Sequence, residues 1–210
     1  MIVTATADSS YINYLKVFVR STLKYNPQYK FIAQLVDCDD DTIKEVEDLG
    51  CIVSAIHPPR KMDMTKKFIK QDDAEALTQF NRGILTPEIR KRAFFSAYEC
   101  FCTHARFPLV ADILRTFSLL GENCIVADAD TIVRSKLDFV ETALEKYELC
   151  MRYEDTKTGI EFVNEGFIAI KNTPTSRRFW TRVATIMTEP AAIIDWDYDT
   201  HALNKAYALH

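Results

Sequence analysis

Hydrophobic and polar positions follow two different periods along the chain, and their succession predicts strands separated by helices. Apolar, partly β-branched runs cover residues 2–7, 31–37, 51–57 and 124–128. After the first run, residues 11–25 repeat apolar side chains at the spacing of one helix face. That predicted core face consists of Tyr11, Tyr14, Leu15, Phe18, Val19 and Thr22. The alternation favours an α/β fold, a mostly parallel mixed sheet flanked by helices.

The rest of the chain contains more helical patterns. Helical periodicity covers residues 90–117, and strand-like runs at 148–153 and 167–172 precede helices predicted over 175–187 and 200–209. Residues 58–90 are polar, charged and weakly periodic, which predicts a lid or an inserted lobe. With 210 residues and no linker-like tract, we expect one domain over residues 1–210.

Composition and charge argue against several classes of protein. The formal net charge is -4, whereas nucleic-acid-binding domains are usually basic, so we expect no nucleic-acid partner. No run reaches the ~20 apolar residues of a transmembrane helix, and the first ten residues lack the pattern of a signal peptide. The six Cys show no disulfide-framework spacing, which indicates reduced thiols and a cytoplasmic location. The sequence carries no sign of an oligomeric state.

Two carboxylates, Asp128 and Asp130, come at the end of the apolar run 124–128, with only Ala129 between them. In extended backbone, side chains two positions apart point to the same side, so we expect the carboxylates to converge. They would repel each other unless a cation compensates. Oxygen ligands suit Mg²⁺ or Mn²⁺, which often shares its shell with substrate phosphates. The pair therefore predicts a metal site, and a solvated surface turn is the alternative.

Other charged residues point to the same region of the fold. Asp8 and Asp37 each lie just beyond a predicted strand, as Asp128 does, and ligands of parallel sheets bind at the carboxyl ends of the strands. The segment RKMDMTKKFIK at 60–70 concentrates positive charge that could meet a diphosphate. An ordinary solvated segment explains the same run.

Residues 124–139 resemble the Asp-x-Asp metal-binding segment of the GT-A glycosyltransferases, particularly of family 8, the galactosyltransferase and glycogenin-like group. Four further segments resemble blocks of that family in the same order. They are residues 4–15, the first strand and nucleotide loop; 103–107, the Tyr-Ala-Arg block; 162–173, the Phe-Asn-x-Gly strand; and 199–204, the Asp-Gln-Asp-x-Leu-Asn block. The resemblance covers nearly the whole chain and implies a GT-A fold with a Rossmann-like nucleotide half.

The resemblance also implies roles for the matched residues, with a UDP-sugar as donor and Mn²⁺ or Mg²⁺ as metal. The implied nucleotide- and donor-binding positions are Thr6, Ala7, Asp8, Tyr11, Arg106, Asp128, Ala129 and Asp130. The implied catalytic residues are Asp199, Arg106 and Asn164, and the metal ligands include Asp128 and Asp130. The acceptor, whether a saccharide, a lipid-linked group or a protein, stays open.

Two departures from the family concern the metal and the sugar. Thr200 and His201 stand where the family has Gln and Asp. The C-terminal His-x-x-Gly-x-x-Lys-Pro-Trp block, which supplies a third metal ligand and a phosphate-binding Lys, has no counterpart in these residues. Three alternatives follow: more water in the metal shell, His201 or His210 as the third ligand, or a shortened family member.

The expected function is therefore metal-dependent sugar transfer with retention of configuration. An inverting enzyme would need a base, for which Asp197 or Asp199 is the candidate. A non-catalytic sugar-nucleotide binding module is the alternative. The segment VADADT also resembles the nucleophile loop of haloacid-dehalogenase-type phosphatases, but that loop usually opens the domain, whereas residues 126–131 lie past the midpoint. Nucleotidyltransferases of related fold need a Gly-rich loop, and residues 1–49 contain no Gly.

Overall fold

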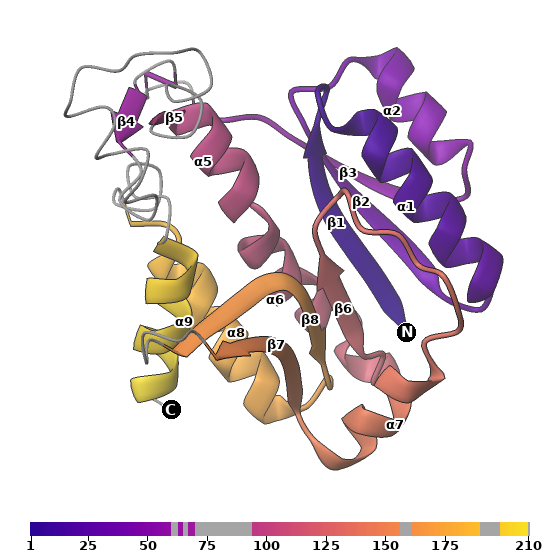
Figure 1. The fold of residues 1–210 in the computed structure, drawn as a ribbon, viewed down its shortest axis with the longest axis vertical. Coiled ribbons are helices and arrows are strands. Elements are labelled where there is room, and N and C mark those ends of the chain that lie inside the picture. Colours follow the sequence, from indigo (N-terminus) through magenta and orange to yellow (C-terminus); the bar gives the residue numbers. More distant parts are fainter. Residues whose placement is uncertain (60–62, 65–66, 70–93, 156–160, 190–197, 210) are drawn as a thin grey trace.

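A six-stranded mixed sheet forms the centre of the computed structural model, which describes residues 1–59, 63–64, 67–69, 94–155, 161–189 and 198–209 (Figure 1). The strand order is β3-β2-β1-β6-β8-β7. The strands are β1 Ile2–Asp8, β2 Lys30–Val36, β3 Ile52–Ile56, β6 Cys124–Ala127, β7 Leu149–Asp155 and β8 Glu161–Ile170. The pairs among β3, β2, β1 and β6 are parallel, and β8 is antiparallel to β6 and β7. The predicted mostly parallel mixed sheet is confirmed.

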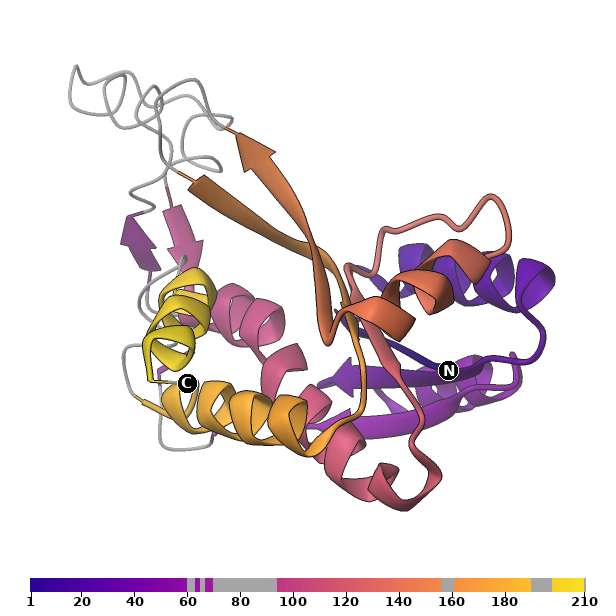
Figure 2. The same ribbon diagram turned by 90° about the horizontal axis from the view of Figure 1, so that it is seen from below.

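Helices cover both faces of this sheet, with α1 and α7 on one side and α6 and α8 on the other (Figure 2). The helices are α1 Ile12–Tyr25, α2 Asp40–Glu47, α5 Ala97–His104, α6 Arg106–Thr116, α7 Asp138–Lys146, α8 Pro174–Ile186 and α9 Tyr198–Ala208. A short ribbon of β4 Lys67–Ile69 and β5 Phe94–Ser96 stands apart from the sheet. None of the described helices has the length and apolar character required to cross a membrane.

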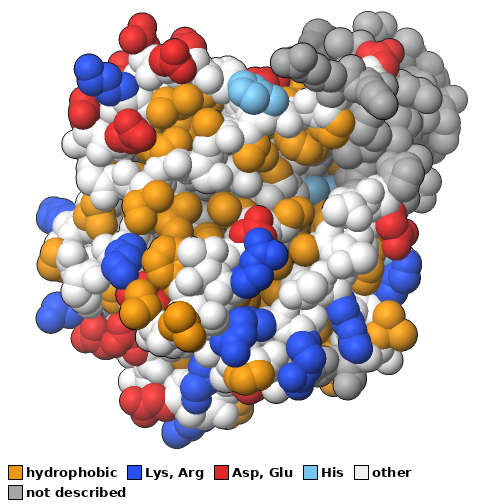
Figure 3. Space-filling view, turned by 180° about the vertical axis from the view of Figure 1, so that it is seen from behind, with side chains coloured by type: hydrophobic (Ala, Val, Ile, Leu, Met, Phe, Trp, Pro, Cys, Tyr) orange, Lys and Arg blue, Asp and Glu red, His pale blue; other side chains and the backbone are white. Residues whose placement is uncertain are grey.

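Local sequence signals explain where several helices begin. The Asp39 side chain accepts the Thr42 N–H at 2.8 Å, which caps α2. Acidic residues in the first turn of α2 favour the positive end of the helix dipole, and acidic side chains gather at the corner where α2 lies (Figure 3). Ser96 and Glu99 form a capping box at the start of α5. These bonds satisfy backbone donors that a helix start leaves free.

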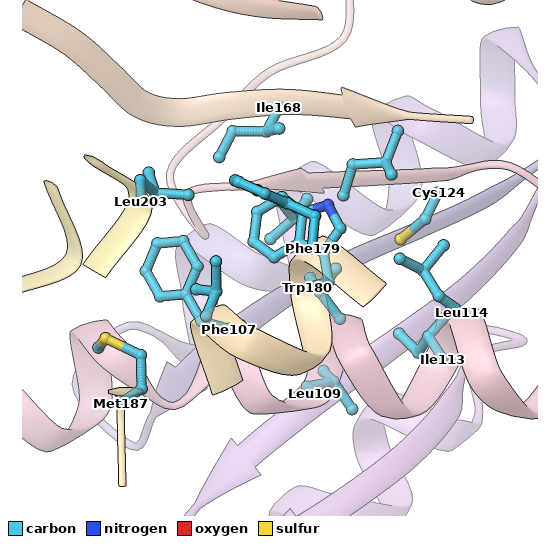
Figure 4. Close-up of a cluster of buried hydrophobic side chains, with 14 of the residues drawn as sticks. Phe107, Leu109, Ile113, Leu114, Cys124, Ile168, Phe179, Trp180, Met187 and Leu203 are labelled. Carbon is cyan, nitrogen blue, oxygen red and sulfur yellow. The ribbon is translucent and has the colours of Figure 1, made fainter. Parts of the chain in front are cut away.

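Alternating side chains on the strands divide the core into two clusters, one on each face. The first cluster takes the even positions of β1 and β6, such as Ile2 and Val126, and packs them against α6, α8 and α9 around Trp180 (Figure 4). The Phe107 and Trp180 rings stack there at 6.0 Å. The second cluster takes the odd positions, such as Val3 and Ile125, and packs them against α1 and α7. The two-residue period of a strand therefore produces the three-layer arrangement.

Two predictions about secondary structure and packing were wrong. Tyr11 and Tyr14 do not belong to the core face of α1, because they are 50% and 57% exposed, while the other four predicted residues are buried. Helical structure does not extend through residues 94–96, which form β5, so the helix starts at Ala97. The predicted lid or insertion at 58–90 lies almost entirely outside the described residues, as does most of the basic segment 60–70.

Candidate active site at the carboxyl ends of β1 and β6

The strand order places a switch point between β1 and β6. From β1 the chain continues to β2 and β3 on one side, while β6 pairs with β1 in parallel on the other side. Ligands of such sheets bind in the crevice outside the carboxyl ends of the strands at this point. Asp8 ends β1, and Asp128 directly follows β6. The topology therefore brings two carboxylates, 120 residues apart in the sequence numbering (128 − 8), to one edge.

The loop after β1 is organised by the carboxylate of Asp8. Its Oδ1 accepts the N–H of Ser10 at 3.0 Å, the N–H of Tyr11 at 3.2 Å and the hydroxyl of Ser10 at 2.6 Å. Among the described residues, no other hydrogen bond to this carboxylate is formed, so Oδ2 stays available to a ligand. The ring of Tyr11 is half exposed and lies 5.7 Å from that of Tyr14. A fixed acceptor beside an exposed aromatic face suits a nucleotide base.

Thr6 and Ala7 are less available to a ligand than the resemblance implies. The hydroxyl of Thr6 donates to the side-chain oxygen of Gln34 at 2.8 Å. Ala7 is 3% exposed and packs in the second core cluster. Any contact of Ala7 with a nucleotide would therefore come from its backbone.

A turn, and not extended backbone, carries Asp128 and Asp130. The Thr131 N–H donates to the Asp128 carbonyl oxygen at 3.1 Å, so the premise that the backbone continues extended is wrong. The turn still presents both carboxylates outward, because Ala129 is buried while Asp128 and Asp130 are exposed. Partial burial, together with the negative charges of Asp130, Asp8 and Asp128, raises the pKa of Tyr11. The Tyr11 hydroxyl and all three carboxylates thus share one region.

Helix α1 holds the segment that follows this turn. The Val133 N–H donates to the Ser21 hydroxyl at 3.2 Å, and the Leu137 N–H donates to the buried Asn26 side-chain oxygen at 2.9 Å. Val133 and Leu137 are themselves buried in the second core cluster. The acidic turn is therefore fixed at both ends, by β6 before it and by α1 after it.

Arg106 connects the acidic turn to α9 from a buried position. It is 7% exposed, at the start of α6, and its Nη1 donates to Asp128 Oδ1. Its Nη2 lies 3.6 Å from Asp199 Oδ2, and Asp199 is 6% exposed. Its guanidinium lies 5.1 Å from the centre of the Phe107 ring. The Nε atom is buried and finds no hydrogen-bond partner among the described residues, which is an opening for a ligand oxygen.

Two histidines that received no predicted role from the sequence each lie beside a carboxylate, His104 beside Asp199 and His57 beside Asp37. His104 Nε2 lies 3.9 Å from Asp199 Oδ2, and both side chains are buried. Its position in the segment 103–107, where the related block has Tyr, is a signal that could have pointed to it. His57 Nδ1 lies 2.7 Å from Asp37 Oδ1 at the ends of β2 and β3. Asp37 has a φ of 50°, in the left-handed region that Asp tolerates better than most residues.

The oxygen ligands at this turn suit a divalent ion that binds together with a phosphate group. They suit an ion bound by protein side chains alone less well. Asp128 and Asp130 offer oxygen ligands, but one oxygen of Asp128 already accepts from Arg106. Within the described ranges, no three His, Cys, Asp or Glu side chains group in a way that could hold a metal. Mg²⁺ commonly binds one or two carboxylates and completes its shell with substrate phosphates and water. Two carboxylates satisfy that requirement.

The remaining predicted site residues stay predictions. Asn164 lies on β8, where it pairs with Arg152, but its side chain lies outside the described part of the structure. His201 is exposed on α9, and its ring lies 5.2 Å from that of Tyr198. Asp197 and His210 lie outside the described residues.

Comparison with solved structures shows the fold. The galactosyltransferase LgtC, in complex with donor and acceptor sugar analogues, matches with a TM-score of 0.54 at 16% identity, over 97% of this chain and 70% of that chain. The glycosyltransferase GlyE of Streptococcus pneumoniae TIGR4 matches with a TM-score of 0.51 at 16% identity, over 98% of this chain and 42% of that chain. The bifunctional glycosyltransferase WbbM matches with a TM-score of 0.51 at 13% identity, over 98% and 37%.

The chain therefore has the GT-A glycosyltransferase fold, as the sequence analysis predicted. It spans less than half of the GlyE and WbbM chains. No protein-family model and no curated protein matches the sequence.

Proposed function

We propose that the protein transfers a sugar from a nucleoside diphosphate sugar, namely a UDP-sugar, to an acceptor. The observation that carries the proposal is the buried Arg106, placed between Asp128 and Asp199 at the switch point of a GT-A fold. A guanidinium is permanently charged and offers several donors in one plane, which suits phosphate and sugar oxygens. Its Nε, which has no hydrogen-bond partner among the described residues, leaves one donor for the substrate.

The base would lie against Tyr11, with a base N–H donating to Asp8 Oδ2. The half-exposed ring of Tyr11 supplies a stacking face, and the hydrogen bonds from Ser10 and Tyr11 fix the Asp8 carboxylate. The acidic turn lies next to this loop, because Asp130 and Asp128 both act on the pKa of Tyr11. A diphosphate attached to the stacked nucleoside would therefore reach the turn.

Asp128 and Asp130 would hold Mn²⁺ or Mg²⁺ together with the diphosphate. The bound ion would supply positive charge for the leaving group. Arg106 adds fixed positive charge from the protein, in a buried place where electrostatic interactions are strong. Asp199 and Asn164 would orient the sugar hydroxyls.

In the transfer itself, the bond between the anomeric carbon and the diphosphate oxygen breaks, and the acceptor oxygen bonds to the anomeric carbon. The nucleoside diphosphate leaves with the bonding electron pair. The acceptor's proton goes to the leaving phosphate in the retaining mechanism that the family resemblance implies. In an inverting mechanism Asp197 or Asp199 would take it instead.

A thermal-shift screen tests the donor class. We expect UDP and UDP-sugars to stabilise the protein only with Mn²⁺ or Mg²⁺, by about 2.7 kcal/mol at a ligand concentration 100 times Kd. GDP-mannose and CMP-sialic acid serve as controls for the base. Stabilisation by every nucleotide alike, or by none, would contradict the proposal.

Release of UDP from UDP-glucose or UDP-galactose tests catalysis. We expect release with Mn²⁺ that Asp130→Asn abolishes, while Asp138→Asn, an exposed carboxylate in the first turn of α7, keeps it. Nucleotide binding without release across donors and acceptors would favour a binding module. Phosphatase activity without a nucleotide donor would contradict sugar transfer.

A further inference from the structure

Among the described residues, the Asp199 carboxylate has two charged or polar neighbours besides its own helix. Its Oδ1 accepts the Thr200 N–H at 2.8 Å, in the first turn of α9. Its Oδ2 lies 3.6 Å from Arg106 Nη2 and 3.9 Å from His104 Nε2. The Arg106 distance exceeds that of a good hydrogen bond, and Arg106 already donates to Asp128. The His104 distance exceeds it as well, so Oδ2 is attracted by both side chains at ion-pair distance and is hydrogen-bonded to neither.

The other nitrogen of His104 lies beside a thiol. Cys100 Sγ lies one helical turn earlier on α5, 3.5 Å from His104 Nδ1. A neutral imidazole has one donor and one acceptor nitrogen. A thiol that donates to Nδ1 leaves the proton on Nε2, and the Asp199 carboxylate beside Nε2 favours the same arrangement. In this tautomer the N–H of Nε2 faces Asp199.

Cys100, His104 and Asp199 also invite comparison with a Cys-His-Asp nucleophilic triad. A nucleophilic thiol must reach its substrate, and reactive cysteines are at least partly exposed. Cys100 is 0% exposed, within α5. The structure therefore gives Cys100 a supporting contact with His104 and no access to a substrate.

We propose that His104 is a positioning residue for Asp199 in the sugar site. This inference rests on the proposed function, since it assigns Asp199 the donor sugar as its partner. The Nε2–H of His104 competes with Arg106 for Oδ2, so that Arg106 stays on Asp128 and Asp199 can still accept a sugar hydroxyl. Without the imidazole, Asp199 Oδ2 closes the 3.6 Å distance to Arg106 Nη2. The N–H groups of Arg106 are then divided between two carboxylates. They no longer point toward the sugar nucleotide.

Two substitutions of His104 separate positioning from packing. In His104→Met the side chain keeps its bulk but loses the N–H, and in His104→Gln an amide N–H remains. We expect kcat for UDP-sugar hydrolysis to fall roughly 10- to 100-fold in His104→Met, the range typical of residues that orient a ligand-bearing side chain. KM for the donor should change less than about 3-fold, because the base and diphosphate contacts are untouched. His104→Gln should recover most of kcat.

Lys205→Gln provides the control on α9, because this exposed residue pairs only with Glu189 among the described residues. It should keep the kcat of the unsubstituted protein. Unchanged kcat in His104→Met would overturn the positioning role. An equal fall in His104→Met and His104→Gln would also overturn it, since packing alone would then explain the effect.

Imidazole ¹⁵N NMR of the full chain supplies a readout independent of activity. We expect the His104 ring in the Nε2–H tautomer, with a ¹⁵N shift that changes in Asp199→Asn. The inference is overturned if the ring is in the Nδ1–H form, or if its ¹⁵N shift is the same in Asp199→Asn, even if the enzyme is active. Failure of the proposed function is a separate result: the unsubstituted protein neither binds a UDP-sugar nor releases UDP, whatever the imidazole signal shows.

Discussion

The nucleotide loop around Asp8 and the buried cluster around Arg106 are neighbouring parts of one site, but the chain builds them in opposite ways. Around Asp8, the hydrogen bonds that the carboxylate forms with described residues span two or three positions, and the side chains are largely exposed. Arg106 instead joins Asp128, 22 residues away, to Asp199, 93 residues away (199 − 106). Its side chain and that of Asp199 are 8% exposed.

This difference decides which substitutions separate function from stability. An exposed carboxylate that loses its partner is solvated by water, so the cost in stability is small. A buried carboxylate that loses its cation remains desolvated and unpaired, which is expensive. Substitutions in the nucleotide loop should therefore change binding alone. Substitutions in the Arg106 cluster should change folding and activity together.

The largest effect is expected from Arg106→Met. It leaves Asp199 buried without its main cation, so we expect the free energy of unfolding to fall by about 3–5 kcal/mol. Urea denaturation followed by circular dichroism measures it. Arg115→Met is the control on the same helix, because Arg115 is 79% exposed and, within the described part of the chain, pairs only with Asp112. Equal stability of the two variants would show that the Arg106 cluster contributes nothing to folding.

Asp130 lies between the nucleotide loop and the Arg106 cluster. Asp130→Asn should lower activity without lowering stability. The side chain is exposed, so the free energy of unfolding should change by less than about 0.5 kcal/mol. UDP release with Mn²⁺ should fall at least roughly 100-fold, because charge stabilisation by a metal contributes several kcal/mol. Steady-state kinetics over a Mn²⁺ titration measure the loss. Full activity of Asp130→Asn at saturating Mn²⁺ would remove Asp130 from the metal site.

The same contrast explains what the sequence could predict. Strands and helices follow from local periodicity, and the predicted strand ends are enough to place Asp8 and Asp128 at one edge of the sheet. The turn at Asp128–Thr131 was named only as the alternative to a metal site on extended backbone, because the hydrogen bond from the Thr131 N–H to the Asp128 carbonyl lies in a sequence that alternates like a strand. The exposure of Tyr14 was not predicted, because helical spacing does not tell where the core face ends. The contact between His104 and Asp199 depends on how α5 meets α9, which no local pattern contains.

Tyr11→Ala tests the nucleotide loop with a smaller effect. Loss of base stacking costs about 1–3 kcal/mol, so KM for the UDP-sugar should rise roughly 5- to 150-fold while kcat changes little. Stability should hardly change, because the ring is half exposed. Tyr11→Phe keeps the stacking face and should bind normally, and Tyr14→Ala tests the neighbouring ring. If Tyr11→Phe binds as weakly as Tyr11→Ala, the hydroxyl and not the ring face contacts the nucleotide.

The smallest effect concerns a thiol remote from both parts of the site. Cys51 precedes β3 at the amino end of that strand, and burial raises its pKa to about 11, whereas an unfolded thiol ionises near pH 8.5. Above that pH the unfolded chain releases a proton that the folded protein retains, so stability falls as pH rises and levels off beyond the folded pKa. We expect a contribution of about 1 kcal/mol between pH 9 and 10.

Urea titrations of the unsubstituted protein and Cys51→Ala at pH 8, 9 and 10 measure this contribution. The decline should be shallower in Cys51→Ala, and what remains should reflect other buried thiols such as Cys124, whose pKa burial raises to about 12. Parallel curves would mean that Cys51 ionises equally in both states. In that case the alkaline loss of stability would come from other groups whose pKa burial raises, among them Tyr29, Tyr98 and Cys102, the last raised to about 12 by burial and the nearby Asp8.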